Sequence, residues 1–102
     1  MNILLACTGG MSASILVDRM KKEAEGRGID CNIEYINKSE IEKRLSKNDF
    51  NVMLLSPQLS LEAGEYKAKA EEGAIVELID MVKFGACDGH ATFNYALELL
   101  GM

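Results

Sequence analysis

The chain of 102 residues has no tryptophan, one proline and one histidine, and it has no long apolar run. The longest runs, such as residues 52–55, have four or five residues, whereas a membrane-spanning helix needs about 20. Basic residues number 11 against 16 acidic ones, which leaves a formal net charge of −5. A nucleic-acid-binding protein would carry a basic face, and an anionic membrane would repel an acidic one. We therefore expect neither nucleic acid nor membrane as a direct partner.

The sequence also lacks cysteine spacings that hold a metal. Cys7, Cys31 and Cys87 form no C-x-x-C pair and no zinc-type pattern, so we expect no metal and no cofactor. The first residues, Met-Asn-Ile-Leu-Leu, begin a strand at once and show neither a charged leader nor a cleavage site. We expect a cytoplasmic protein whose cysteines are free thiols.

What the chain does have is enough apolar sequence for one core. Hydrophobic residues make up 48% of it, and a chain of this length buries roughly 65% of its unfolded surface. No repeat, low-complexity tract or linker interrupts it. We expect residues 1–102 to form a single domain.

Strand and helix patterns alternate along the whole sequence. Short apolar runs predict strands at residues 2–6, 31–36, 52–55 and 74–79. Apolar spacing predicts helices at 13–25 and 59–72, a capping box at Ser39–Glu42 opening a helix to about Asn48, a short turn or helix at 80–85, and a last helix around Phe93 to Leu100. This order predicts an α/β fold with a four-stranded parallel sheet in the order 2-1-3-4 and helices on both faces.

The most informative stretch joins the first strand to the first helix, and it reads Cys7, Thr8, Gly9, Gly10, Met11, Ser12, Ala13, Ser14. Backbone N–H groups of such a loop and of the following helix converge on one point, where the helix dipole favours an anion. The glycines allow a tight turn and the serine hydroxyls can donate. A thiol there has its thiolate favoured. The pattern predicts a nucleophilic Cys7 that holds a phosphoryl group; the alternative is an ordinary turn with the cysteine as apolar filler.

The predicted topology also indicates that the Cys7 loop binds a ligand. In the order 2-1-3-4 the winding reverses between strands 1 and 3, and ligands bind outside the carboxyl ends of the strands at such a point. The loop after strand 3 contains Ser56, Pro57 and Gln58. We expect Pro57 and Gln58 to form a second loop at the site, where the Gln58 amide contacts the phosphate or a partner; an ordinary turn contact is the alternative.

The Cys7 loop, C-T-G-G-M-S-A-S, resembles that of enzyme IIB of the bacterial phosphoenolpyruvate-dependent sugar phosphotransferase system, in its lactose/cellobiose (chitobiose) family. Leu54–Gln58 is similar to that family's L-L-G-P-Q, with Ser56 in place of the glycine. Glu77–Asp80 is similar to its E-V-I-D, and Phe84–Gly89 to its aromatic-G-x-x-D-G. The resemblance spans nearly the whole chain and implies a fold like that of low-molecular-weight phosphatases.

This resemblance implies a phosphotransferase that carries a phosphoryl group. A phosphohistidine of enzyme IIA would phosphorylate Cys7, the loop from Thr8 to Ser14 would hold the phosphate, and the membrane component enzyme IIC would present the sugar that receives it. The implied sugar is a β-linked disaccharide such as cellobiose, chitobiose or lactose, and enzyme IIC rather than this chain would select it. Exposed apolar residues around the loop, Met11 above all, would serve the docking of these partners.

Two other functions compete. A low-molecular-weight phosphatase or arsenate reductase uses a C-x5-R loop, but the sixth position after Cys7 is Ala13, and no arginine in the loop could clamp the phosphate. Asp88 would have to be its general acid, although it is better placed to cap the last helix. A non-catalytic module that binds a small anion is the second alternative, and it predicts that Cys7→Ser keeps all function.

The remaining reactive residues have ordinary interpretations. His90 follows Asp-Gly at a helix start, and we expect it to be an exposed polar residue rather than a phosphoryl acceptor. Cys31 is expected to pack on the apolar side of strand 2. Cys87 lies in a loop that could approach the site, where a regulatory disulfide with Cys7 is the alternative to a free thiol.

Overall fold

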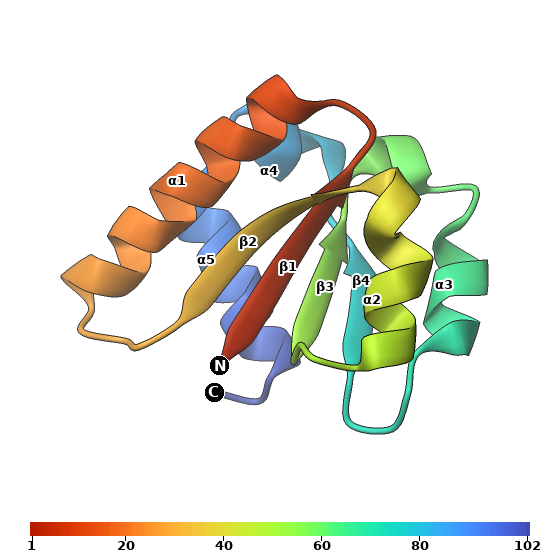
Figure 1. Cartoon of the computed structure of the whole chain (residues 1–102). Coiled ribbons are helices and arrows are strands. Elements are labelled where there is room, and N and C mark those ends of the chain that lie inside the picture. Colours follow the sequence, from red (N-terminus) through yellow and green to blue (C-terminus); the bar gives the residue numbers. More distant parts are fainter.

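A parallel sheet of four strands forms the middle layer of the protein (Figure 1). The computed structural model describes all of residues 1–102. The strands are β1 (Asn2–Cys7), β2 (Asn32–Asn37), β3 (Val52–Leu55) and β4 (Ile75–Leu78). Their spatial order is β2-β1-β3-β4 and every pair is parallel, which confirms the predicted topology.

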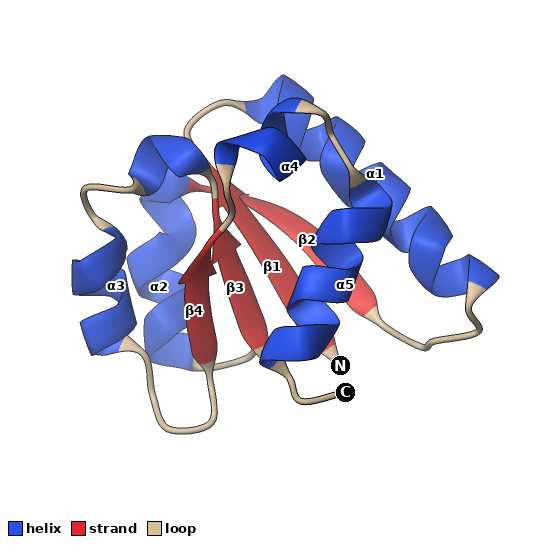
Figure 2. Ribbon diagram, turned by 180° about the vertical axis from the view of Figure 1, so that it is seen from behind, coloured by secondary structure: helices blue, strands red, loops and turns tan.

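Helices cover both faces of this sheet (Figure 2). One face carries α1 (Gly10–Gly26), α4 (Met81–Gly85) and α5 (Gly89–Leu99), and the other carries α2 (Ile41–Lys47) and α3 (Ala63–Lys69). Two single 3₁₀ turns follow strands: η1 (Lys38–Glu40) after β2 and η2 (Pro57–Leu59) after β3. None of the helices combines the length and apolarity needed to cross a bilayer.

Strand β1 separates two apolar cores. Its side chains Ile3, Leu5 and Cys7 pack with α1 and α5, whereas Leu4 and Ala6 pack with α2 and α3. Every one of these five is at most 2% exposed. Because burial of one large aliphatic side chain contributes about 1.5–3 kcal/mol, the two cores together fix which way each β1 side chain points.

The starts of α1 and α2 differ from the prediction. Helix α1 begins at Gly10 rather than residue 13, because Gly9 already has the extended conformation of an N-cap (φ −137°, ψ 150°). The capping box predicted at Ser39–Glu42 is wrong: the Asn37 side chain accepts the Ser39 N–H at 3.1 Å, and the Glu40 carboxylate accepts the Asn37 N–H at 3.0 Å. Asparagine caps as well as serine, and this one is reached first at the end of β2.

The predicted third helix and second strand are also corrected. The helix expected at 59–72 is shortened to α3, because the 3₁₀ turn that Pro57 opens still includes Leu59 and the backbone becomes extended at Ala70 (φ −66°, ψ 135°). Strand β2 lies at the sheet edge as expected, but Ile36 is buried as well as Ile33. The strand runs from Asn32 to Asn37, one residue later than the predicted 31–36, and Ile36 packs under α2.

Helices α1 and α5 approach closely where Gly89 meets Arg19. A Cβ on Gly89 would lie 2.6 Å from the Arg19 Cβ and 2.7 Å from its carbonyl carbon, so only glycine permits this approach. The Arg19 guanidinium then donates to the carbonyl oxygens of Cys87 at 3.0 Å and Ala86 at 3.4 Å. The connection between α4 and α5 is thereby held against α1.

Candidate functional site

Cys7 ends β1 at the carboxyl edge of the sheet, beside the start of α1. It pairs in register with Asn37 of the neighbouring strand, and it is only 2% exposed. Its thiol donates to the side-chain oxygen of Gln58, with Sγ and Oε1 3.9 Å apart. The two loops that the topology predicts to meet are therefore in contact through these two side chains.

The backbone between Cys7 and the first turn of α1 presents unused hydrogen-bond donors. No backbone N–H of residues 8–12 donates to another atom of the protein. No side chain caps α1, and its first turn holds no acidic residue. Residues 8–12 and Ser14 are exposed, whereas Ala13 is fully buried and offers only its backbone. The helix dipole and these N–H groups favour an anion at this end of α1.

The glycines were predicted to allow a tight turn, but the backbone here uses no conformation that requires glycine. Gly9 has a negative φ, and neither Gly9 nor Gly10 adopts a left-handed conformation. An added Cβ on Gly9 would meet no atom within 4 Å, and one on Gly10 only the Tyr35 hydroxyl at 3.9 Å. The space above both glycines is open, so a ligand could approach the backbone there.

The second loop is fixed by its own backbone. The Ser56 N–H donates to the Ala6 carbonyl at 2.9 Å, and the Leu59 N–H donates to the Ser56 carbonyl at 2.9 Å. Ser56 and Leu59 are both fully buried, so the turn between them projects Gln58 toward Cys7. Pro57 opens this turn and makes no hydrogen bond to Cys7.

A third segment, between α4 and α5, reaches the first turn of α1. The Cys87 thiol lies 3.7 Å from the Ser12 carbonyl oxygen, and Cys87 itself has a positive φ of 50°. All three cysteines are free thiols, and Cys31 packs partly buried against the α1-side core, as expected. Sequence reasoning missed Arg19, which secures this segment, because nothing near it in the chain indicates a contact 68 residues away.

Asp88 and His90 take the ordinary roles expected of them. The Asp88 carboxylate accepts the Ala91 N–H at 2.9 Å and so caps α5. His90 is exposed, and its Nδ1 lies 2.7 Å from the Glu23 carboxylate of α1. Neither side chain forms a hydrogen bond with Cys7.

The lysines around the carboxyl edge are already paired. Lys38, which follows Asn37 and lines a shallow groove with Thr8, lies 2.9 Å from Glu62, and this hydrogen bond raises the pKa of the lysine. Lys83 lies 2.6 Å from Asp80, and its hydrogen bond lowers the pKa of that carboxyl. Positive potential for an anion beside Cys7 therefore comes chiefly from the backbone of α1.

Four exposed apolar side chains lie on α1 and α4, next to the site. Met11 and Ile15 are 80% and 42% exposed, and Met81 and Val82 are 77% and 80% exposed. The two helices pack together, so we call these four residues the α1–α4 patch. Met11 is therefore exposed, as predicted. A hollow lined by Pro57, Gln58 and Met81 continues from the patch toward the second loop.

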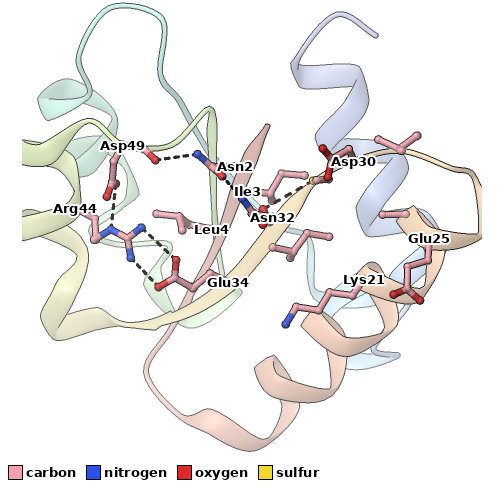
Figure 3. Close-up of a pocket in the computed structure, with 14 residues that line it drawn as sticks. Asn2, Ile3, Leu4, Lys21, Glu25, Asp30, Asn32, Glu34, Arg44 and Asp49 are labelled. Atoms are coloured by element: carbon pink, nitrogen blue, oxygen red, sulfur yellow. Dashed lines mark hydrogen bonds and ion pairs between the residues drawn. The ribbon is translucent and has the colours of Figure 1, made fainter.

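A larger hollow of about 770 Å³ lies along the edge strand β2, lined in part by Asn2, Lys21 and Glu34 (Figure 3). It contains none of the predicted site residues. Its Arg44 is paired with Glu34 at 2.9 Å and with Asp49 at 3.1 Å. Arg44, Glu34 and Asp49 therefore satisfy one another's charges.

The chain is similar in sequence to members of one known protein family. The model of the family described as "PTS system, Lactose/Cellobiose specific IIB subunit" matches residues 2–94. The oligo-β-mannoside-specific EIIB component of Bacillus subtilis is 36% identical over 96% of this chain and 94% of its own length. The cellobiose-specific and galactose-specific EIIB components of Lactococcus lactis are each 34% identical, again over 96% of this chain and 94% of theirs.

Solved structures agree with these matches. The cellobiose-specific IIB component of Borrelia burgdorferi superposes with a TM-score of 0.74 at 33% identity, covering 96% of this chain and 89% of that one. The lactose-specific IIB domain of Streptococcus pneumoniae superposes with a TM-score of 0.80 over 96% and 95% of the two chains. At 15% identity the latter likeness concerns the fold alone.

Proposed function

Because the chain belongs to the lactose/cellobiose-specific IIB family of the phosphotransferase system, we propose that it carries a phosphoryl group on Cys7 from an enzyme IIA to a sugar. Family membership confirms the predicted fold class and makes the protein a phosphotransferase component with a general carrier role. The residue that carries the group, the partners and the sugar are parts of the proposal.

The observation that carries the proposal is the thiol of Cys7 beside five free backbone N–H groups. Phosphoryl transfer passes through a loose transition state with charge spread over three oxygens, so a protein accelerates it by positioning groups and by stabilising that charge. Preorganised N–H donors of residues 8–12 and the dipole of α1 supply this stabilisation. The loop from Thr8 to Ser14 is thus the proposed phosphate-binding segment, with Ala13 contributing only its backbone.

A carrier must also keep its phosphocysteine from water until the next partner arrives, and the site fits that need better than hydrolysis. Position 13, where a phosphatase loop has its arginine, holds a buried alanine. Arg19 is engaged with the carbonyls of Ala86 and Cys87, and Asp88 is engaged as a helix cap. No guanidinium clamp and no free general acid therefore faces Cys7.

The proposed partners are enzyme IIA, as donor, and the membrane component enzyme IIC, where the sugar is bound. The named relatives act on oligo-β-mannoside, cellobiose and galactose. For this chain we propose that the sugar receiving the phosphoryl group is a β-linked disaccharide such as cellobiose, chitobiose or lactose. We also propose that the protein acts in the cytoplasm. One sheet carries both loops of the site, which supports a single IIB domain over residues 1–102.

The direct test uses a variant that retains Cys7 as its only thiol, Cys31→Ala with Cys87→Ser. Incubated with phosphoenolpyruvate, enzyme I, HPr and a cognate IIA, it is expected to gain the mass of one phosphoryl group, with acid and alkaline quenches separating phosphocysteine from phosphohistidine. An unmodified protein that hydrolyses an aryl phosphate would establish the phosphatase instead. An unmodified protein without that activity would favour the anion-binding module.

The α1–α4 patch is the proposed docking surface for IIA. Substituting Met81→Ser together with Val82→Ser is expected to raise the KM for phosphorylated IIA about tenfold, equivalent to about 1.4 kcal/mol of lost apolar contact. The unfolding midpoint should not change, since both side chains are exposed. The matched control is Met102→Ser, because Met102 is exposed and the C-terminus lies at the opposite end of the sheet from the site (Figure 1). An unchanged KM in the double variant would refute this docking surface.

A further inference from the structure

We propose that Gln58 is a further catalytic residue, whose side-chain amide reverses its orientation between the thiol and the phosphocysteine forms of Cys7. This inference rests on the proposed carrier function. Its starting point is the contact between Cys7 Sγ and Gln58 Oε1 at 3.9 Å, the one side-chain hydrogen bond that the sulfur makes. In this form the thiol donates its proton and the amide oxygen accepts it.

The position of Gln58 is set by buried neighbours. Ser56 before it and Leu59 after it are fully buried, and the Ser56 N–H is bonded to β1 at Ala6, the residue preceding the reacting cysteine. Gln58 itself is exposed, whereas Cys7 is buried. The amide is therefore held by a rigid turn yet has room to rotate, at the point where the buried sulfur meets the surface.

A carboxamide suits a carrier because it offers an acceptor and two donors on one group. Rotation by a half-turn about its last bond exchanges the oxygen for the NH₂ group. The amide can then donate to the thiolate that attacks and to a phosphoryl oxygen once the phosphorus–sulfur bond exists. An ionised carboxylate could only accept, and it would repel both anions.

The step balances without any change of redox state. The phosphorus–nitrogen bond of the donor phosphohistidine breaks as the phosphorus–sulfur bond to Cys7 forms. The proton lost by the thiol equals the proton gained by the departing imidazole, and the phosphoryl charge moves onto the cysteine. Gln58 neither gains nor loses a proton, and only its hydrogen bonds change direction.

Gln58 is the only glutamine in the chain, so its side-chain NH₂ can be followed directly. In ¹⁵N NMR spectra the pair is assigned by its disappearance in Gln58→Leu. It is expected to shift when Cys7 is phosphorylated, whereas the amide of Asn94, bound to His90 on α5, should stay unchanged. An unmoved Gln58 signal in a phosphorylated protein would overturn the inference.

The second measurement is the rate of phosphocysteine formation in Gln58 variants that also carry Cys31→Ala and Cys87→Ser. Phosphocysteine formation is expected to be about tenfold slower in Gln58→Leu, which loses one hydrogen bond to a charged group. It should be about a hundredfold slower in Gln58→Glu, which adds repulsion. Ser60→Ala, in the same turn and also exposed, should stay within about twofold of wild type. Wild-type rates in both Gln58 variants would overturn the inference while leaving the carrier function standing.

A third measurement needs no phosphoryl donor, so it separates the two claims. Alkylation of Cys7 by iodoacetamide at pH 7 is expected to be about tenfold slower in Gln58→Glu than in Gln58→Leu, because the carboxylate disfavours the attacking thiolate. Equal alkylation rates would overturn the contact between Gln58 and the reacting sulfur. Failure of wild type to accept a phosphoryl group would instead refute the proposed function.

Discussion

Replacing Cys7 by serine is expected to abolish phosphoryl transfer to sugar, with a loss on the order of 10³-fold or more. A hydroxyl ionises far less readily than a thiol, so it attacks the donor phosphorus poorly. Any serine phosphoester that formed would be a poor donor to the sugar. The measurement is the rate of sugar phosphorylation in the reconstituted system, together with the intact mass of the variant after exposure to the donor.

The matched controls are Cys31→Ser and Cys87→Ser, which leave Cys7 in place and should retain transfer. Serine is nearly isosteric with cysteine, and Gln58 can accept a hydrogen bond from either group. The Cys7→Ser protein should therefore fold and still compete with wild type for phosphorylated IIA. Full activity in Cys7→Ser would refute the carrier role of Cys7 and leave the anion-binding module as the better description.

Gly89→Ala is expected to lower the free energy of unfolding by about 3 kcal/mol. The new methyl group would lie 2.6–2.9 Å from the Cβ, carbonyl carbon and carbonyl oxygen of Arg19. Backbone atoms cannot turn aside as the end of a flexible side chain can, so α5 must move away from α1. Urea unfolding measures this loss, which is a large part of the 5–15 kcal/mol that stabilises a typical domain.

Gly64→Ala is the control for that substitution. Gly64 lies in α3, where an added Cβ meets no atom within 4 Å. Alanine is the better helix former, so this variant should gain up to about 1 kcal/mol. Equal stabilities of the two variants would show that α1 and α5 do not meet as closely as the structure indicates.

Strand order was predictable from the sequence because short apolar runs alternate with helical patterns, and right-handed crossovers leave few arrangements for such a chain. Helix boundaries were less predictable. Asn37 and Ser39 both suit an N-cap, and the choice of Asn37 depends on where β2 ends, which the sheet decides. The early start of α1 at Gly10 likewise depends on the extended backbone of Gly9.

At the site, contacts between segments distant in the chain could be predicted only where topology brings them together. The approach of Gln58 to Cys7 follows from the neighbouring positions of β1 and β3. The hydrogen bond from Arg19 to the Cys87 carbonyl and the contact of Gly89 with Arg19 do not follow from any local sequence pattern. They depend on how α1 and α5 cross, which side-chain packing determines after the fold is set.

The division of β1 between two cores has a consequence for where a reacting cysteine can stand. Cys7 faces α1 only because it is an even number of residues from Ile3 and Leu5, which anchor the same side. Inserting or deleting one residue in the strand would place the sulfur under α2 and α3, on the wrong side of the sheet from the α1–α4 patch. The number of residues in β1 before Cys7 can therefore change only by an even number. Keeping this number even or odd is as much a requirement of the site as the cysteine itself.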